Sequence, residues 1–132
     1  MAKHIWTIAC QNVLIDKHTN LASYINSFDQ IGIPSLPYVF PPLIIASLWK
    51  REKKGEKFEI KVAVISPNDQ VIKEKVLSEF SFANSFHRSH IRVSPFDIEV
   101  AGEYKIQISL KTGNKWKLIN TLPIIVNCES PN

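Results

Sequence analysis

Apolar and polar residues alternate along two long segments of the chain. In residues 58–64 every second side chain is apolar, and Glu59 and Lys61 lie between them. The same period of two recurs in residues 104–110. Because neighbouring side chains of a strand point to opposite faces, each segment is predicted to be a strand with one buried face and one wet face.

Turn-forming residues bound both segments: residues 54–56 precede the first, residues 67–70 follow it, and residues 112–114 follow the second. Turns of this kind join antiparallel neighbours. Further strands are predicted over residues 5–15, 43–49, 71–82, 86–93, 116–118 and 122–126. About eight strands follow, spaced too closely for crossover helices. The predicted fold class is all-β, an antiparallel two-sheet β-sandwich.

Three of these strands carry extra information. Residues 43–49 begin apolar on both faces, which predicts a central or covered strand. In the opening strand, Trp6, Ile8 and Cys10 fall on one side, and residues 16–20 are predicted to follow as a turn. In the last strand Pro123 lacks the N–H that a ladder requires, so it is expected at a bulge or an edge.

Residues 21–31 allow two interpretations. Leu21, Ile25 and Phe28 fit helical spacing, whereas Tyr24, Asn26 and Phe28 fit a strand. The β-branched and aromatic residues favour the strand. Residues 31–42 then hold four of the eight prolines among apolar residues, which predicts a stiff, extended crossing between elements.

Composition is that of an ordinary folded domain. The 132 residues are 45% hydrophobic and 21% charged, so one domain over residues 1–132 is expected. The longest apolar stretch, residues 41–49, is shorter than the ~20 residues that a spanning helix needs, and no signal-peptide pattern opens the chain.

Cys10 and Cys128 are the only cysteines. They are expected to be free thiols in the cytoplasm, although neighbouring terminal strands would let them meet.

The segment from Pro95 to Ile106, with Gly102-Glu103-Tyr104 at its centre, resembles the late corner of immunoglobulin-like sandwiches. That resemblance implies a hydrogen bond from the Tyr104 hydroxyl back to upstream backbone. The whole chain resembles small uncharacterised bacterial single-domain proteins in its opening strand, residues 28–31 with the Pro-rich crossing, the turn at residues 67–69 and this corner. The likeness implies a compact immunoglobulin-like or C2-like sandwich without an assigned activity.

Residue types that carry chemistry are present but not arranged as a site. His87 and His90 are three residues apart, which places them on opposite faces of a strand and prevents them from sharing a metal ion. The four glycines are not clustered, so no phosphate-binding loop is expected. Asp97 and Glu99 share a face of an extended segment, which is typical of a solvated edge. We therefore expect no cofactor, no metal and no enzymatic activity.

Basic residues are the most informative chemical feature of a chain whose formal net charge is +4. Around the turn at residues 50–57, five basic residues against two glutamates give a local net charge of +3. The basic members are Lys50, Arg51, Lys53, Lys54 and Lys57. Such a turn can contact phosphates, but interleaved glutamates favour a solubilising turn. A second strip, Arg88, His90 and Arg92, lies on one face of residues 86–93 and would bind an acidic partner or pair with glutamates across the sheet.

A scaffold without a chemical constellation predicts a non-enzymatic, cytoplasmic interaction module that binds another protein through loops or edges. The first alternative is a nucleic-acid-binding domain that uses residues 50–57, with Trp49 or Trp116 as stacking residues. An enzyme with a spatially assembled site is the third candidate. A free sheet edge would equally support a homodimer.

Overall fold

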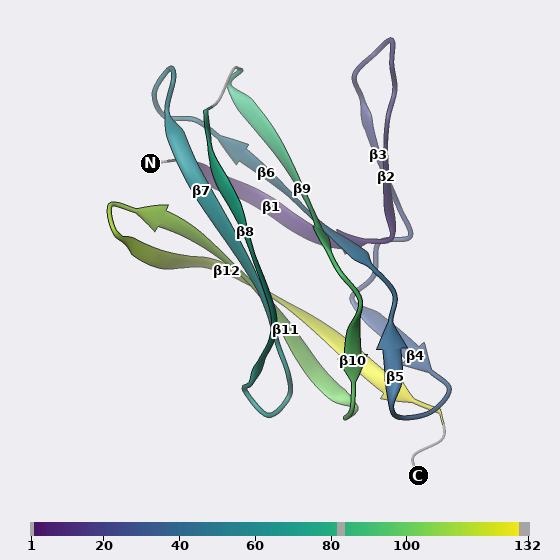
Figure 1. The fold of residues 1–132 in the computed structure, drawn as a ribbon. Helices are drawn as coiled ribbons and strands as arrows, with labels where there is room; N and C mark the ends of the chain where they lie inside the picture. Colours follow the sequence, from purple (N-terminus) through teal and green to yellow (C-terminus); the bar gives the residue numbers. More distant parts are fainter. Residues whose placement is uncertain (1, 82–83, 130–132) are drawn as a thin grey trace.

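The computed structural model describes residues 2–81 and 84–129, and every regular element in them is a strand (Figure 1). The strands are β1 (Lys3–Cys10), β2 (Asn12–Ile15), β3 (Ala22–Ile25), β4 (Gln30–Ile33), β5 (Tyr38–Phe40), β6 (Leu43–Lys50), β7 (Lys57–Ile65), β8 (Val71–Ser81), β9 (Phe86–Val93), β10 (Phe96–Ile98), β11 (Gly102–Thr112) and β12 (Lys115–Cys128). The all-β prediction is confirmed, but the count of about eight is wrong because several expected elements divide into short strands. No helix of the described part is long and apolar enough to cross a membrane.

Two main sheets organise the chain. The first has the order β1-β6-β9 and is antiparallel throughout. The second has the order β4-β12-β11-β7-β8, in which only the β4 pairing with β12 is parallel. Two small ladders complete the fold, β5 with β10 and β2 with β3. In Figure 1 the β2–β3 hairpin projects away from the other strands.

Side chains from both main sheets form one buried cluster. The five-stranded sheet contributes Ile60, Ile106 and Ile108, while the three-stranded sheet contributes Ile45 and Trp49. Trp49 is fully buried, and its Nε1 donates a hydrogen bond of 2.8 Å to the Ser47 hydroxyl. The indole is thus both packed and satisfied, as a buried tryptophan must be.

Periodicity located the long strands correctly. Residues 58–64 and 104–110 lie in β7 and β11, which are neighbours with buried inner faces. Residues 43–49 lie in β6, the central strand of its sheet. The expected strand at 71–82 corresponds to β8, although Phe82 lies outside the described residues.

The last strand is longer than expected. Residues 116–118 and 122–126 belong to one strand, β12, with a register shift opposite Ile108 and Ser109. Pro123 lies opposite Lys105, and the pairing of β12 with β4 begins only at Ile125. At Pro123 the described part of the sheet therefore has a free edge on one side, as its missing N–H requires.

The first third of the chain differs most from expectation. Residues 5–15 divide after Cys10 into β1 and β2. Residues 21–31 form strands rather than a helix, but in two pieces, β3 and the start of β4. The proline-rich residues 31–42 are not one extended crossing, because residues 34–37 bend between β4 and β5 and Tyr38–Phe40 pair with β10.

The resemblance at residues 95–106 predicted one hydrogen bond correctly. The Tyr104 hydroxyl donates to the Val100 carbonyl at 2.8 Å. Gly102 precedes it with a φ of 136°, a conformation that L residues rarely adopt, and packs against Pro67. Both cysteines are free thiols, Cys10 buried and Cys128 half-buried.

Candidate functional site

The three-stranded sheet is apolar on its outer face as well as on its inner face. The register pairs Trp6 with Leu48 and Cys10 with Ile44 on the side away from the core. Ile44 and Cys10 are nevertheless buried. Strand alternation confirms that Trp6, Ile8 and Cys10 share a face, but that face is turned away from the main core and is covered by another part of the chain.

The β2–β3 hairpin provides this cover. The Tyr24 ring contacts the ring of Trp6 edge to face, with 5.4 Å between centroids, and the ring of His90 at 5.6 Å. The Tyr24 hydroxyl is hydrogen-bonded to His90 Nε2 at 3.2 Å. An Arg88 guanidinium N–H donates to the Asn20 carbonyl at 2.7 Å. The hairpin is thus held to β9 through the Tyr24 side chain of β3 and the Asn20 carbonyl of the turn.

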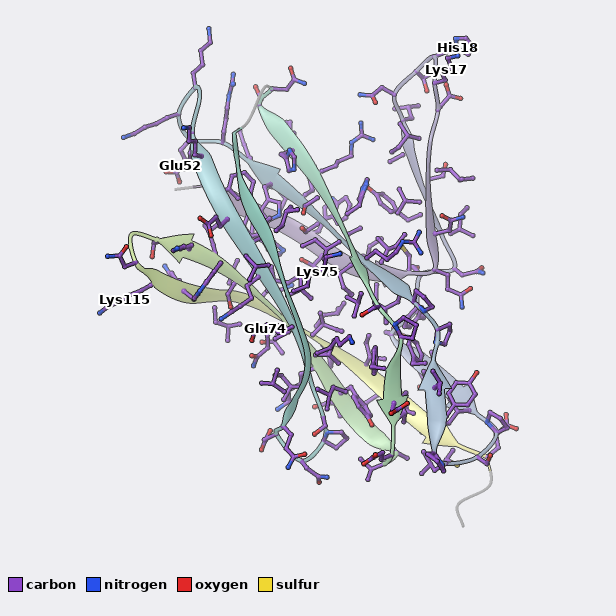
Figure 2. All side chains as sticks on the ribbon, in the orientation of Figure 1. Lys17, His18, Glu52, Glu74, Lys75 and Lys115 are labelled. Carbon is purple, nitrogen blue, oxygen red and sulfur yellow. The ribbon has the colours of Figure 1, made fainter. Side chains whose placement is uncertain are left out.

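Local sequence explains why the hairpin forms. The Asp16 carboxylate accepts the backbone N–H groups of His18 and Thr19, both at 2.8 Å, and these bonds hold the pKa of Asp16 below its ordinary value. Asn20 takes a positive φ of 59°, which suits asparagine in a turn. Lys17 and His18 lie at the tip of the hairpin (Figure 2). The predicted turn at residues 16–20 is therefore confirmed.

The opposite face of the hairpin is apolar and exposed. Leu14 lies directly across from Ser23, and Leu21 and Ile25 lie two residues to either side of Ser23, so the three apolar side chains share one face. Leu21 is 68% exposed and Leu14 is 55% exposed. With Ile15, the hairpin holds four of the ten large hydrophobic side chains that the described part of the chain exposes. We call Leu14, Leu21 and Ile25 the hairpin patch.

The strip of Arg88, His90 and Arg92 exists as a row, but its surroundings were not predicted. The three residues pair across β6 with Leu48, Ala46 and Ile44, which are apolar. The expected pairing with glutamates across the sheet is therefore wrong. Instead, Arg88 is hydrogen-bonded to the Asn20 carbonyl of the hairpin and His90 to the Tyr24 hydroxyl.

Burial favours the uncharged forms of Tyr24 and His90, the two groups that join the hairpin to β9. Desolvation, and secondly the Arg88 charge, lowers the pKa of His90. Desolvation raises the pKa of Tyr24, with Cys10 adding to the effect and Arg88 opposing it. Both shifts favour the uncharged forms, so a neutral phenol and a neutral imidazole share the hydrogen bond at pH 7.

The basic turn at residues 50–57 joins β6 to β7. One carboxylate organises it: that of Glu56 accepts the backbone N–H of Glu52 at 2.9 Å. Lys50 Nζ lies 5.9 Å from the centroid of the Phe86 ring, and the Arg51 N–H donates to the Ser85 carbonyl. Lys53 and Lys54 are exposed. The turn is thus ordered in part by its own Glu56.

The two tryptophans expected to stack on nucleic-acid bases, Trp49 and Trp116, differ in solvent exposure. Trp49 is buried in the core, so its expected role in stacking is wrong. Trp116 is half-buried, with Lys61 Nζ at 4.9 Å and Lys111 Nζ at 5.9 Å from its centroid. Lys57 and Lys111 line a polar hollow of about 270 Å³, which brings one residue of the basic turn near this cluster.

The histidine geometry is confirmed. His87 packs edge to face on Phe58 of the opposite sheet, with centroids 5.8 Å apart, whereas His90 faces Tyr24 on the other side of β9. Within residues 2–81 and 84–129, no three His, Cys, Asp or Glu side chains gather closely enough to hold a metal ion.

Fold and surface define a small all-β protein with two main sheets and a projecting hairpin that is apolar on both faces. The chain belongs to a family of unknown function, DUF6941, whose match spans residues 5–126. A search of curated proteins found no match to the sequence.

Sequence reasoning missed Tyr24 and the hairpin patch. The available signal was the apolar residues on both sides of the turn at residues 16–20, which mark a hairpin. Nothing local indicates that Tyr24 meets His90, because 66 positions separate them in sequence.

Proposed function

We propose that this protein is a non-enzymatic interaction module that binds another protein through the hairpin patch. The exposed apolar face of Leu14, Leu21 and Ile25 carries this proposal. Contiguous exposed apolar side chains are uncommon on monomers and mark interaction sites when polar residues surround them. Lys17 at the tip, Arg88 beside the hairpin and the net charge of +4 favour a partner whose apolar surface has an acidic rim.

The way the hairpin is held supports presentation to a partner. An isolated two-stranded hairpin is marginally stable in water. Here Tyr24 and Asn20 attach it to β9, and the backbone bond from Phe28 N–H to the Ala9 carbonyl, 3.0 Å long, closes its base. A hairpin fixed in this way would lose little conformational freedom on binding.

We also infer an immunoglobulin-like sandwich. The order β1-β6-β9 corresponds to strands A, B and E of that fold, and β12-β11-β7-β8 corresponds to G, F, C and C′. The bond from the Tyr104 hydroxyl to the Val100 carbonyl supports the assignment. The two free thiols fit a reducing cytoplasm.

A capture experiment tests the proposed function. Tagged protein and the L14D/L21D double variant are incubated with extract of the source cells, and retained proteins are identified by mass spectrometry. The wild type should retain a partner that the double variant loses, because two carboxylates on the patch cannot be desolvated without cost. L118D adds the same charge to an exposed leucine of β12 and should retain that partner. Equal recovery with all three proteins, or a monomer without partners at physiological salt, contradicts the proposal.

A nucleic-acid-binding function is the second candidate, and the cluster of Lys61, Lys111 and Trp116 favours it. An aromatic ring with lysines beside it resembles the stacking platforms of single-strand binders. Fluorescence titration with single-stranded RNA and DNA over a salt series tests it. Affinity should fall as salt rises and should weaken in K61E but not in K17E. No binding at low salt contradicts this second candidate.

A further inference from the structure

The two main sheets leave free edges on the same side of the molecule. In the described residues β8 pairs only with β7, and β9 pairs only with β6. Two hollows lie along this seam, about 380 Å³ and about 200 Å³ in volume, and Lys73 of β8 lines both. We call the seam, from the turn at residues 66–70 to Lys75, the β8 groove.

The larger hollow is acidic at its rim. β10 and the loop after it contribute Asp97 and Glu99, both exposed, and the β7–β8 turn contributes Asn68 and Gln70. Phe96 and Tyr104 also line it. Two carboxylates beside amide groups suit a cationic side chain with a long apolar stem.

Around the smaller hollow, Lys73, Lys75 and Arg92 outnumber one carboxylate, Glu74, and Val62 and Val64 form its apolar floor. Lys73 and Lys75 lie opposite Val64 and Val62 in the register, so both lysines stand on the inner face of the sheet. Lys75 Nζ crosses the seam and donates to the Arg92 carbonyl on the free edge of β9, at 2.9 Å. This bond is exposed, so exchanging it for another partner costs little. Figure 2 labels Glu74 and Lys75 on β8.

The spacing of the hollows follows the period of a strand. One lies beside residues 72–73 and the other beside residues 73–75 of β8. In a strand added to β8, side chains two residues apart would point into the groove about 7 Å from each other. Added strands in other proteins gain affinity from main-chain hydrogen bonds and specificity from hollows for alternate side chains.

We propose that the β8 groove binds an extended peptide segment of a partner protein as an added strand on β8, with a basic side chain at Asp97 and Glu99 and an acidic side chain two residues away at Lys73 and Lys75. The chemistry recognised is a Lys-x-Asp or Asp-x-Lys pattern, according to strand direction. Without a peptide, Lys73 and Lys75 disfavour pairing of the free β8 edge with strands of other chains, because inward-pointing charges oppose such pairing. The proposal is independent of the hairpin patch, which lies on the outer side of the three-stranded sheet.

Nuclear magnetic resonance titration of the ¹⁵N-labelled protein tests the groove. The probes are two acetylated, amidated heptapeptides, Thr-Val-Lys-Thr-Asp-Val-Thr and Thr-Val-Asp-Thr-Lys-Val-Thr, and a third with threonine at both charged positions. One charged peptide should give saturable shifts at residues 68–75 and 94–99, with a Kd of about 1 mM or below. The uncharged peptide should bind about tenfold more weakly.

Charge reversal and N-methylation separate strand addition from plain charge attraction. K73E/K75E should no longer bind the charged peptide and should instead bind a peptide in which lysine replaces the aspartate. K115E, at the start of β12, should leave binding unchanged. N-methylating alternate peptide residues should abolish binding in one set and spare it in the other, because only alternate N–H groups face the edge. No saturable shift at about 1 mM, shifts outside the groove, or equal tolerance of both methylation sets overturns the proposal.

Discussion

The Tyr24 hydroxyl lies 3.2 Å from His90 Nε2, and this contact joins the β2–β3 hairpin to β9, an edge strand of the three-stranded sheet. Trp6 packs against the same phenol from β1. The hairpin is therefore attached through one aromatic side chain that is apolar on its ring and polar at its end.

Replacing Tyr24 with phenylalanine removes the hydroxyl and keeps the ring. We expect Y24F to have an unfolding free energy about 1 kcal/mol lower, because the imidazole loses its hydrogen-bond partner while the ring contact remains. Amide hydrogens of β2 and β3 should exchange faster. S23A, on the exposed face of β3, is the control. Unchanged exchange in the hairpin of Y24F would contradict the assigned attachment.

Acid should weaken the fold through its half-buried histidines. Burial lowers the pKa of His90, with Arg88 adding to the effect, and burial with His90 lowers that of His87. The unfolded chain therefore binds protons more readily than the folded one below the ordinary value of 6.5. The unfolding free energy should fall as pH drops from about 7 to about 5. Urea midpoints across this range should decline less steeply in H90Q and H87Q, and a flat wild-type profile would refute the mechanism.

Gly102 should resist substitution. Its φ of 136° is strained for any side chain, and a Cβ would lie 3.1 Å from Pro67 Cγ. We expect G102A to cost about 1–3 kcal/mol in chemical denaturation. G32A is the matched control, since a Cβ there meets only the Glu129 carboxylate, at 3.7 Å. Equal losses in the two variants would show that the Gly102 geometry does not matter.

Trp49 and Trp116 should contribute very differently to stability. W49A should cost about 3–5 kcal/mol, because it empties a fully buried site and leaves the Ser47 hydroxyl without its donor. W116A should cost much less, since Trp116 is only half-buried. Circular dichroism in urea measures both. Similar midpoints for the two variants would place Trp49 outside the core.

Much of the fold follows from local pattern. The alternation at residues 58–64 and 104–110 determines which side chains enter the core, whatever sheet they join. The hydrogen bond of Tyr104 was implied by the resemblance to the late corner of immunoglobulin-like sandwiches, and it spans only four residues. The function predictions, a protein partner or a nucleic acid, stay predictions.

The candidate sites were less accessible from the sequence. The strip of Arg88, His90 and Arg92 has the right alternation for a solvent-facing row. Whether that row meets water, glutamates or a hairpin depends on which distant segment folds over it. The same holds for Asp97 and Glu99, which local pattern assigned to a solvated edge and which the structure places across a seam from Lys73.

By itself the sequence predicted the all-β class, the long strands at residues 58–64 and 104–110 with their buried faces, and the turn at residues 16–20, because each depends on side-chain period or on contacts a few residues long. The tyrosine corner was implied by a family resemblance. Only the tertiary structure decided that Tyr24 meets His90, that Trp49 is enclosed, and that β8 and β9 leave a groove between free edges. Those features arise where segments distant in sequence pack together, and no local period encodes which face of one segment meets which face of another.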